Sequence, residues 1–133
     1  MQRIKFLKSQ FKKVQKEAKR IAVLNGGEVC GLILNNGAFF ELVQVRNKTK
    51  SGGGFSFYFS EIRAIERAAS LIDHEIVGTF HSHPVGLPQP GFSDLFNAVD
   101  DSLLLIFDVL GHSARLWHVK NQKSKPIGFS LAD

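Results

Sequence analysis

The chain has 133 residues, of which 44% are hydrophobic and 22% are charged, a balance typical of one globular domain with a full core. Its single cysteine, Cys30, excludes an internal disulfide and a multi-cysteine zinc site, and it fits a reducing compartment. No apolar run reaches the roughly 18 residues that a membrane span needs. No signal-peptide core follows the basic N-terminus. We therefore expect a single cytoplasmic domain over residues 1–133 with no membrane partner.

The net charge of +5 is concentrated at one end of the chain. Residues 1–20 carry eight basic residues and one acidic residue, whereas the remainder carries nine basic and eleven acidic residues. A nucleic-acid interface would need stacking or base-reading side chains beside these charges, and the sequence offers none in a recognisable pattern. The basic residues are interpreted as the solvated face of a helix, and no nucleic-acid partner is expected.

Apolar residues at three- and four-residue spacing predict helices at residues 3–21 and 60–72, and a short third helix is predicted at residues 93–100. Pro126 makes the last strand an edge strand, because proline cannot donate to a ladder. The predicted strands cover residues 28–34, 38–45, 55–59, 75–81, 102–109, 114–119 and 125–131. The fold class is therefore α+β, or mixed α/β. A single curved mixed sheet is flanked by the long N-terminal helix and the second helix.

The sequence HSHPVGLPQPGFSD at residues 81–94 contains the candidate metal ligands. His81 and His83 end a predicted buried strand, where side chains two residues apart point to the same side. Asp94 follows a proline-rich loop that is long enough to double back. Two imidazoles and one carboxylate are three ligands for Zn²⁺, and they leave the fourth tetrahedral position open, as in catalytic sites. The histidine pair alone is a weak signal, since histidines also occur at strand ends as ordinary polar residues.

A zinc hydrolase also needs a general base within reach of its water molecule. Asp100 and Asp101 follow the far end of a predicted helix, and Glu75 begins the histidine strand about 20 Å away by strand rise. Glu28 begins a strand directly after a turn, and the start of one antiparallel strand can lie beside the end of another. The residues alone permit Glu28 as the base without requiring it.

The EVCGLIL sequence at residues 28–34, followed about fifty residues later by HSHP and then by an Asp eleven residues past the second His, resembles the JAMM family. This family, also called MPN-plus or JAB-domain, consists of zinc metalloproteases, and the chain looks like a minimal prokaryotic-type member. The resemblance covers nearly the whole chain and implies a cytidine-deaminase-like JAMM architecture. It implies one Zn²⁺ per chain bound by His81, His83 and Asp94, with Glu28 as the general base.

The same resemblance implies an isopeptidase or peptidase that cleaves after the C-terminal glycine of a ubiquitin-like protein, in deconjugation or precursor processing. In the family the substrate tail commonly pairs as an added strand beside the metal. Residues 52–58 are the candidate pairing edge, with Phe57 and Phe59 as candidate contacts in the substrate groove. Ordinary core packing is the alternative for both rings.

The chain departs from the family pattern at Gly91, where the family usually has a serine that stabilises the oxyanion. Losing one oxyanion donor typically costs about 10²–10³ in rate. Ser93 is a candidate substitute, and the N-cap of the helix after it is its alternative role. Gly91 is also the one feature that favours another class of function, a catalytically silent MPN-type binding or assembly module.

Overall fold

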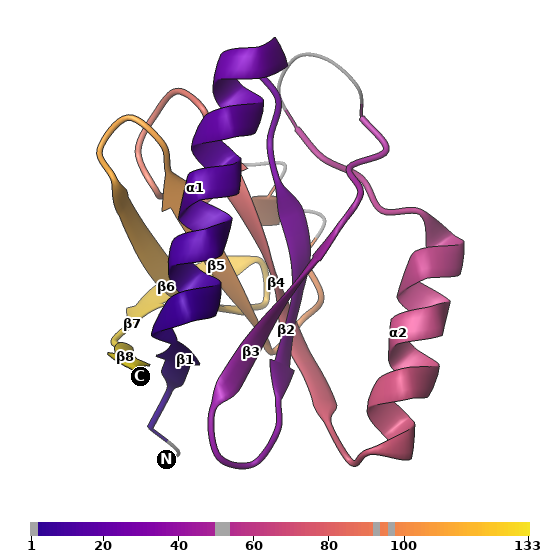
Figure 1. The fold of residues 1–133 in the computed structure, drawn as a ribbon. Helices are drawn as coiled ribbons and strands as arrows, with labels where there is room; N and C mark the ends of the chain where they lie inside the picture. Colours follow the sequence, from indigo (N-terminus) through magenta and orange to yellow (C-terminus); the bar gives the residue numbers. More distant parts are fainter. Residues whose placement is uncertain (1–2, 50–53, 92–93, 96–97) are drawn as a thin grey trace.

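The computed structural model describes the chain apart from residues 1–2, 50–53, 92–93 and 96–97 (Figure 1). Its elements in order are β1 (Lys5–Leu7), α1 (Lys8–Asn25), β2 (Cys30–Asn35), β3 (Phe40–Val45), α2 (Phe59–Leu71), β4 (Glu75–His83), β5 (Ser102–Asp108), β6 (Ser113–Lys120), β7 (Lys123–Ile127) and β8 (Ser130–Ala132). The strands form one sheet in the order β7-β6-β5-β4-β2-β3-β1-β8. The described chain is thus α+β, with a curled mixed sheet and two helices, as the sequence predicts. None of the described helices is long and apolar enough to cross a membrane.

Three central strands position the functional side chains. β2 runs antiparallel to β4, and β4 runs parallel to β5. In this register His81 lies between Cys30 on β2 and Ile106 on β5. The start of β2 therefore lies beside the end of β4, which is the juxtaposition that the sequence permits but does not require.

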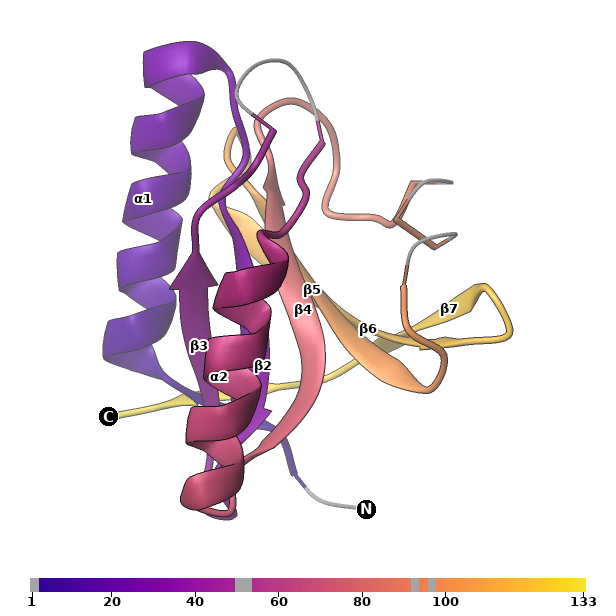
Figure 2. The same cartoon turned by 90° about the vertical axis from the view of Figure 1, so that its right-hand side faces the viewer.

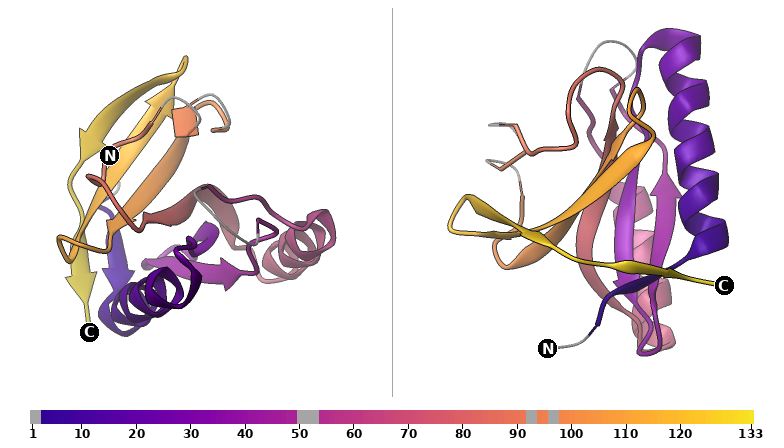
Figure 3. Two further views of the ribbon diagram at one scale, coloured as in Figure 1. Left: turned by 90° about the horizontal axis from the view of Figure 1, so that it is seen from above. Right: turned by 90° about the vertical axis from the view of Figure 1, so that its left-hand side faces the viewer.

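The two helices cover different faces of the sheet (Figure 2). α1 packs its buried residues Phe11, Val14 and Ala18 into the largest hydrophobic cluster, together with Phe6 of β1 and Phe107 of β5. α2 packs on a second cluster that contains residues of β2 and β4 on the opposite face. Figure 3 shows the curl of the sheet from above, with α1 and α2 beside its β2–β3 part.

The histidines interrupt the apolar lining of the α2 face. Because side chains alternate along a strand, Cys30 lies on the same face of β2 as Leu32 and Leu34. His81 pairs with Cys30, and His83 lies two residues further along β4, so both histidines share that face. On the far side of the histidines a third cluster forms from Leu104, Ile106, Trp117 and Val119, with Leu95 and Ala98 packed against it. The polar pair thus lies between two apolar clusters, on the face opposite α1.

The N-terminal prediction was wrong at its start. The helix begins at Lys8 rather than residue 3, because residues 5–7 form β1 between β3 and β8. Phe6 pairs with Phe40 and Leu131 and is fully buried, so sheet pairing takes this segment out of the helix. The helix also runs on to Asn25, where Gly26 has a φ of 71° and closes the last turn with a hydrogen bond to Ala22.

Three further boundaries differ from the sequence predictions. Residues 54–58 form no strand, and α2 begins at Phe59. The predicted last strand at 125–131 is two strands, β7 and β8, which lie at opposite edges of the sheet. Residues 94–95 are helical, but residues 98–99 are not, so the helix predicted at 93–100 is shorter.

Candidate metal centre

His81, His83 and Asp94 bring three ligand atoms together at the end of β4. His81 Nε2 lies 3.1 Å from His83 Nε2 and 3.2 Å from Asp94 Oδ1, and His83 Nε2 lies 3.4 Å from Asp94 Oδ2. Ligands at zinc bond lengths of about 2.0–2.1 Å in a tetrahedron would be separated by about 3.3 Å. The two histidine nitrogens are therefore separated like two corners of such a site, and each lies at a similar distance from one oxygen of the Asp94 carboxylate. The three residues that the sequence selects can thus each offer one ligand atom to a metal.

The centre is closed on one side and accessible on the other. The His81 side chain is 1% exposed, whereas the His83 and Asp94 side chains are 18% and 12% exposed. Phe55 stacks on the His81 imidazole with ring centroids 4.6 Å apart and planes inclined by 25°. A molecule from solution can therefore approach along His83 and Asp94.

A backbone carbonyl fixes the tautomer of His83. Its Nδ1 lies 2.8 Å from the carbonyl oxygen of Leu87, which can only accept, so Nδ1 carries the proton. When the ring is neutral, Nε2 then has the lone pair that a metal ligand requires. Among the described residues, the buried Nδ1 of His81 has no hydrogen-bond partner.

The electrostatics of the centre favour a positive charge between these groups. Burial raises the pKa of the Asp94 carboxyl, but hydrogen bonds from His81 and His83 outweigh it and hold that pKa well below its usual range. The hydrogen bond to Asp94 raises the pKa of His83, against the effect of burial, and the charge of Glu28 contributes in the same direction. A divalent cation could replace the protons that this group of residues otherwise attracts.

Glu28 lies on the same face as the histidines. Cys30 pairs with His81, so extending the antiparallel register by two residues puts Glu28 opposite His83. Glu28 is buried, its Oε2 accepts a hydrogen bond from the Gly54 amide at 2.6 Å, and its buried Oε1 has no partner in the described part of the chain. A buried carboxylate oxygen without a partner is costly unless water or a ligand group satisfies it. The donor set and this oxygen together fit a hydrated zinc ion.

Gly91 contacts the candidate ligand directly. Its amide donates a hydrogen bond to Asp94 Oδ2 at 2.8 Å. A Cβ atom at this position would lie 3.7 Å from the same oxygen, which is ordinary van der Waals contact, so the backbone has room for a side chain. Ser93, the candidate substitute donor, lies outside the described residues.

The two candidate groove residues have different surroundings. Phe57 is half-buried and packs against the cluster under α2, whereas Phe59 is 73% exposed at the start of α2. Cys30 is buried beside the centre, and burial, together with the charges of Glu28 and Glu61, raises the pKa of its thiol to about 12. Its thiol is therefore protonated near neutral pH and is a poor nucleophile.

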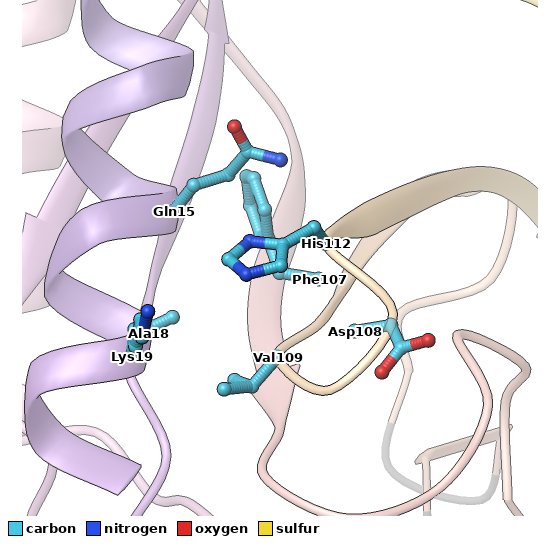
Figure 4. A pocket seen from close by; sticks show the side chains of 7 residues that line it. All are labelled: Gln15, Ala18, Lys19, Phe107, Asp108, Val109 and His112. Carbon is cyan, nitrogen blue, oxygen red and sulfur yellow. The ribbon is translucent and has the colours of Figure 1, made fainter. Parts of the chain in front are cut away.

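Another cavity contains a histidine and a carboxylate but offers no metal site. It lies between α1 and the turn after β5 and has a volume of about 10 Å³, which is room for one water molecule. Figure 4 shows His112 pointing toward α1, while the Asp108 carboxylate points away from it. The two groups do not converge.

Solved structures with the same fold share this architecture, although no protein-family model and no curated protein matches the sequence. A JAB1/MPN domain protein from Archaeoglobus fulgidus aligns with a TM-score of 0.66 at 16% identity, over 98% of this chain and 100% of its own. A structure described as a JAMM metalloprotease-like zinc site in the proteasome and signalosome aligns with a TM-score of 0.58 at 15% identity, over 99% and 100%. The chain has the JAMM/MPN fold.

The chain also aligns with the solution structure of a Desulfitobacterium hafniense protein, at a TM-score of 0.79 and 20% identity, over 98% of this chain and 93% of that one. The resemblance inferred from EVCGLIL, HSHP and the later Asp is thus confirmed for the fold. The roles of Glu28, His81, His83 and Asp94 within this JAMM/MPN fold stay predictions.

Several contributors to the centre were not predicted from the sequence. Phe55 covers His81, the Leu87 carbonyl orients His83, and Gly54 holds Glu28. Two of these contacts use backbone groups, which every residue type has, so the sequence does not indicate them. Asn47 donates to the Glu28 carbonyl and accepts a hydrogen bond from the Thr49 amide in an Asx turn. An asparagine in a polar loop is typical of such a turn, and this was the available sequence signal for Asn47.

Proposed function

We propose that this chain is a zinc-dependent isopeptidase or peptidase that cleaves after the C-terminal glycine of a ubiquitin-like protein. One observation carries the proposal: the Nε2 atoms of His81 and His83 lie 3.1 Å apart, and each lies 3.2–3.4 Å from one oxygen of the Asp94 carboxylate. The carboxylate of Glu28 lies on the same face. Metal ligands that leave one position open, with a carboxylate nearby, are the components of metal-assisted hydrolysis.

Each residue has a role in this proposal. His81 and His83 bind the metal through Nε2, and Asp94 binds it through its carboxylate. When bound, zinc polarises the substrate carbonyl and makes water a better nucleophile at neutral pH. Glu28 takes a proton from the attacking water at Oε1 and returns it to the leaving amine. Its Oε2 is already bonded to Gly54, so Oε1 is the oxygen left for this transfer.

The substrate class rests on the resemblance to the JAMM family and on the similar structure from the proteasome and signalosome. A Gly-Gly tail suits a narrow approach to the metal, since no side chains need room. Residues 54–58 form no strand here, so an added substrate strand would require this segment to change its backbone pairing on binding. Phe59, with its exposed ring, is the better placed of the two candidate groove contacts.

A silent binding or assembly module is the second candidate, and Gly91 is the observation that favours it. This position lacks the hydroxyl that the family usually supplies to the oxyanion. In that case a ubiquitin-like protein would bind without being cleaved.

The test is cleavage of a ubiquitin-like protein whose C-terminal Gly-Gly is extended by a short peptide, or is joined to a lysine side chain. We expect the zinc-loaded protein to release the modifier, Glu28→Gln to retain zinc and keep only a small residual kcat, and Glu66→Gln to behave as the parent. Glu66 is an exposed glutamate on α2 and serves as the matched control. Binding without cleavage would select the silent module, and neither binding nor cleavage would overturn both functions.

A further inference from the structure

Asn47 connects three separate parts of the backbone near the candidate centre. Its Nδ2 donates to the carbonyl oxygens of Glu28 and Gly54, at 3.0 and 3.2 Å. Its Oδ1 accepts from the amides of Thr49 and Ser56, at 2.9 and 3.1 Å. Four hydrogen bonds use the full donor and acceptor capacity of the amide, so its orientation is fixed.

Two of these hydrogen bonds form a closed link with Glu28. Asn47 holds the Glu28 backbone directly and holds Gly54 through its carbonyl, while the Gly54 amide donates to Glu28 Oε2. Gly54 has a φ of 94°, which L-residues rarely adopt, and a Cβ there would meet nothing within 4 Å. The glycine is therefore needed for its backbone conformation, which directs its N–H at the carboxylate.

We propose that Asn47 is a positioning residue for Glu28, acting through the Gly54 amide. The link determines that Glu28 Oε2 is the carboxylate oxygen that accepts the Gly54 hydrogen bond. The buried Oε1 is left without a hydrogen-bond partner among the described residues. The consequence for catalysis rests on the proposed function, because it requires Glu28 to exchange protons with water at the metal. The hydrogen-bonded link itself does not depend on that function.

A small displacement of the base is enough to slow a reaction, since misplacement by about 1 Å can cost on the order of 10² in rate. Asn47 contacts none of the three candidate metal ligands by hydrogen bond, so its removal should leave zinc in place. We therefore expect Asn47→Ala to lower kcat at least tenfold, with zinc content and KM close to those of the parent.

The first test follows exchange of the Gly54 amide hydrogen by NMR and needs no activity. We expect Asn47→Ala to accelerate Gly54 exchange at least tenfold, while exchange of the β2, β4 and β5 amides is unchanged. Thr49→Val is the matched control, because it removes the Thr49 Oγ1–Ser56 Oγ contact of 3.1 Å in the same segment and leaves Asn47 intact. Unchanged Gly54 exchange in Asn47→Ala would overturn the inference.

A second variant covers the case in which Asn47→Ala does not fold. Asn47→Asp keeps an acceptor for the Thr49 and Ser56 amides but loses both donor bonds, so it should accelerate Gly54 exchange without opening the segment. Protection of Gly54 in this variant equal to that in the parent would contradict the proposed link.

The second test is a double-mutant cycle with Glu28→Gln. If Asn47 acts through Glu28, Asn47→Ala lowers kcat in the parent and adds no further loss in the Glu28→Gln background. An equal fold-loss in both backgrounds would contradict the positioning role. A zinc-loaded parent that cleaves no substrate would remove the proposed function, and Gly54 exchange would still decide whether Asn47 holds the link.

Discussion

Val29 and Ser82 exchange two hydrogen bonds, from the Val29 amide to Ser82 Oγ at 2.9 Å and from the Ser82 amide to the Val29 carbonyl at 3.1 Å. Ser82 lies between the two histidines on β4, but its side chain points to the opposite face. The contact extends the pairing of β2 with β4 beyond Cys30. It therefore places Glu28, the next residue before Val29, opposite His83.

Removing the Ser82 hydroxyl should weaken this pairing. Ser82 is fully buried, so Ser82→Ala leaves the Val29 amide without its side-chain acceptor and should lower the free energy of unfolding by about 1–3 kcal/mol. Denaturant unfolding measures the loss. Ser113→Ala, at an exposed strand position, is the control and should change stability by less than about 0.5 kcal/mol. Equal stability of the two variants would show that the contact contributes little.

Two aspartates pair with histidines, and comparing them distinguishes a metal ligand from a surface contact. Asp94 lies between His81 and His83, whereas Asp101 pairs with His118 at 2.7 Å on the surface. We expect Asp94→Asn to weaken zinc binding by at least about 100-fold, since mutating even a residue that only hydrogen-bonds to a metal ligand typically lowers metal affinity about 10–100-fold. Asp101→Asn should bind one zinc as the parent does. Calorimetric titration distinguishes the two, and parental zinc affinity in Asp94→Asn would exclude Asp94 as a ligand.

Gly91 offers a gain-of-function test. A Cβ at this position has ordinary contact distances, so Gly91→Ser should fold as the parent does. Since one oxyanion donor is worth about 10²–10³ in rate, the new hydroxyl should raise kcat by at least tenfold if it reaches the reacting carbonyl. Gly91→Ala controls for the added Cβ and should leave kcat unchanged. Equal kcat values for Gly91→Ser and Gly91→Ala would contradict the view that the missing hydroxyl limits cleavage.

The metal-free protein should show a pH-dependent contribution from the His83–Asp94 pair. The pKa of Asp94 is lowered from 3.8, so its contribution is present above that value and is lost as pH falls through the lowered pKa. The pKa of His83 is raised from 6.5, so its contribution is complete below 6.5 and is lost as pH rises through the raised pKa.

The stability difference between the parent and Asp94→Asn, measured in chelator, should therefore be largest between about pH 4 and 6.5 and should shrink at higher pH. Urea unfolding at a series of pH values measures it. A difference that grows from pH 6.5 to 8 would contradict these pKa directions.

The central part of the fold follows from local sequence patterns. His81 and His83 share a face because strand side chains alternate, and an apolar run placed them at the end of a buried strand. The Asn-Asn-Gly turn predicts the hairpin, where Asn35 Oδ1 accepts from the Gly37 amide. The prediction that Asp94 lies beside the histidines required only that the loop between them be long enough to fold back.

The errors arose where distant pairing overrode local spacing. Ile4 and Leu7 fit the three- and four-residue spacing of the helix that follows. Phe6 between them is nevertheless buried in a strand between two sequence-distant partners. β7 and β8 are separated by only two residues in sequence and are predicted from it as one strand, yet they lie at opposite edges of the sheet. Two contacts orient the centre: the Gly54 amide donates to the Glu28 carboxylate, and His83 Nδ1 donates to the Leu87 carbonyl. Each uses a backbone group, so no residue pattern specifies it.

A crystal structure of the zinc-loaded protein, with anomalous data at the zinc edge, tests the convergence of the four side chains most directly. We expect one anomalous peak about 2.0–2.2 Å from His81 Nε2, His83 Nε2 and an Asp94 oxygen, with Glu28 within reach of one bridging water molecule. A peak bound elsewhere, or a Glu28 carboxyl more than about 8 Å from the midpoint of the two imidazoles, would contradict the proposed centre.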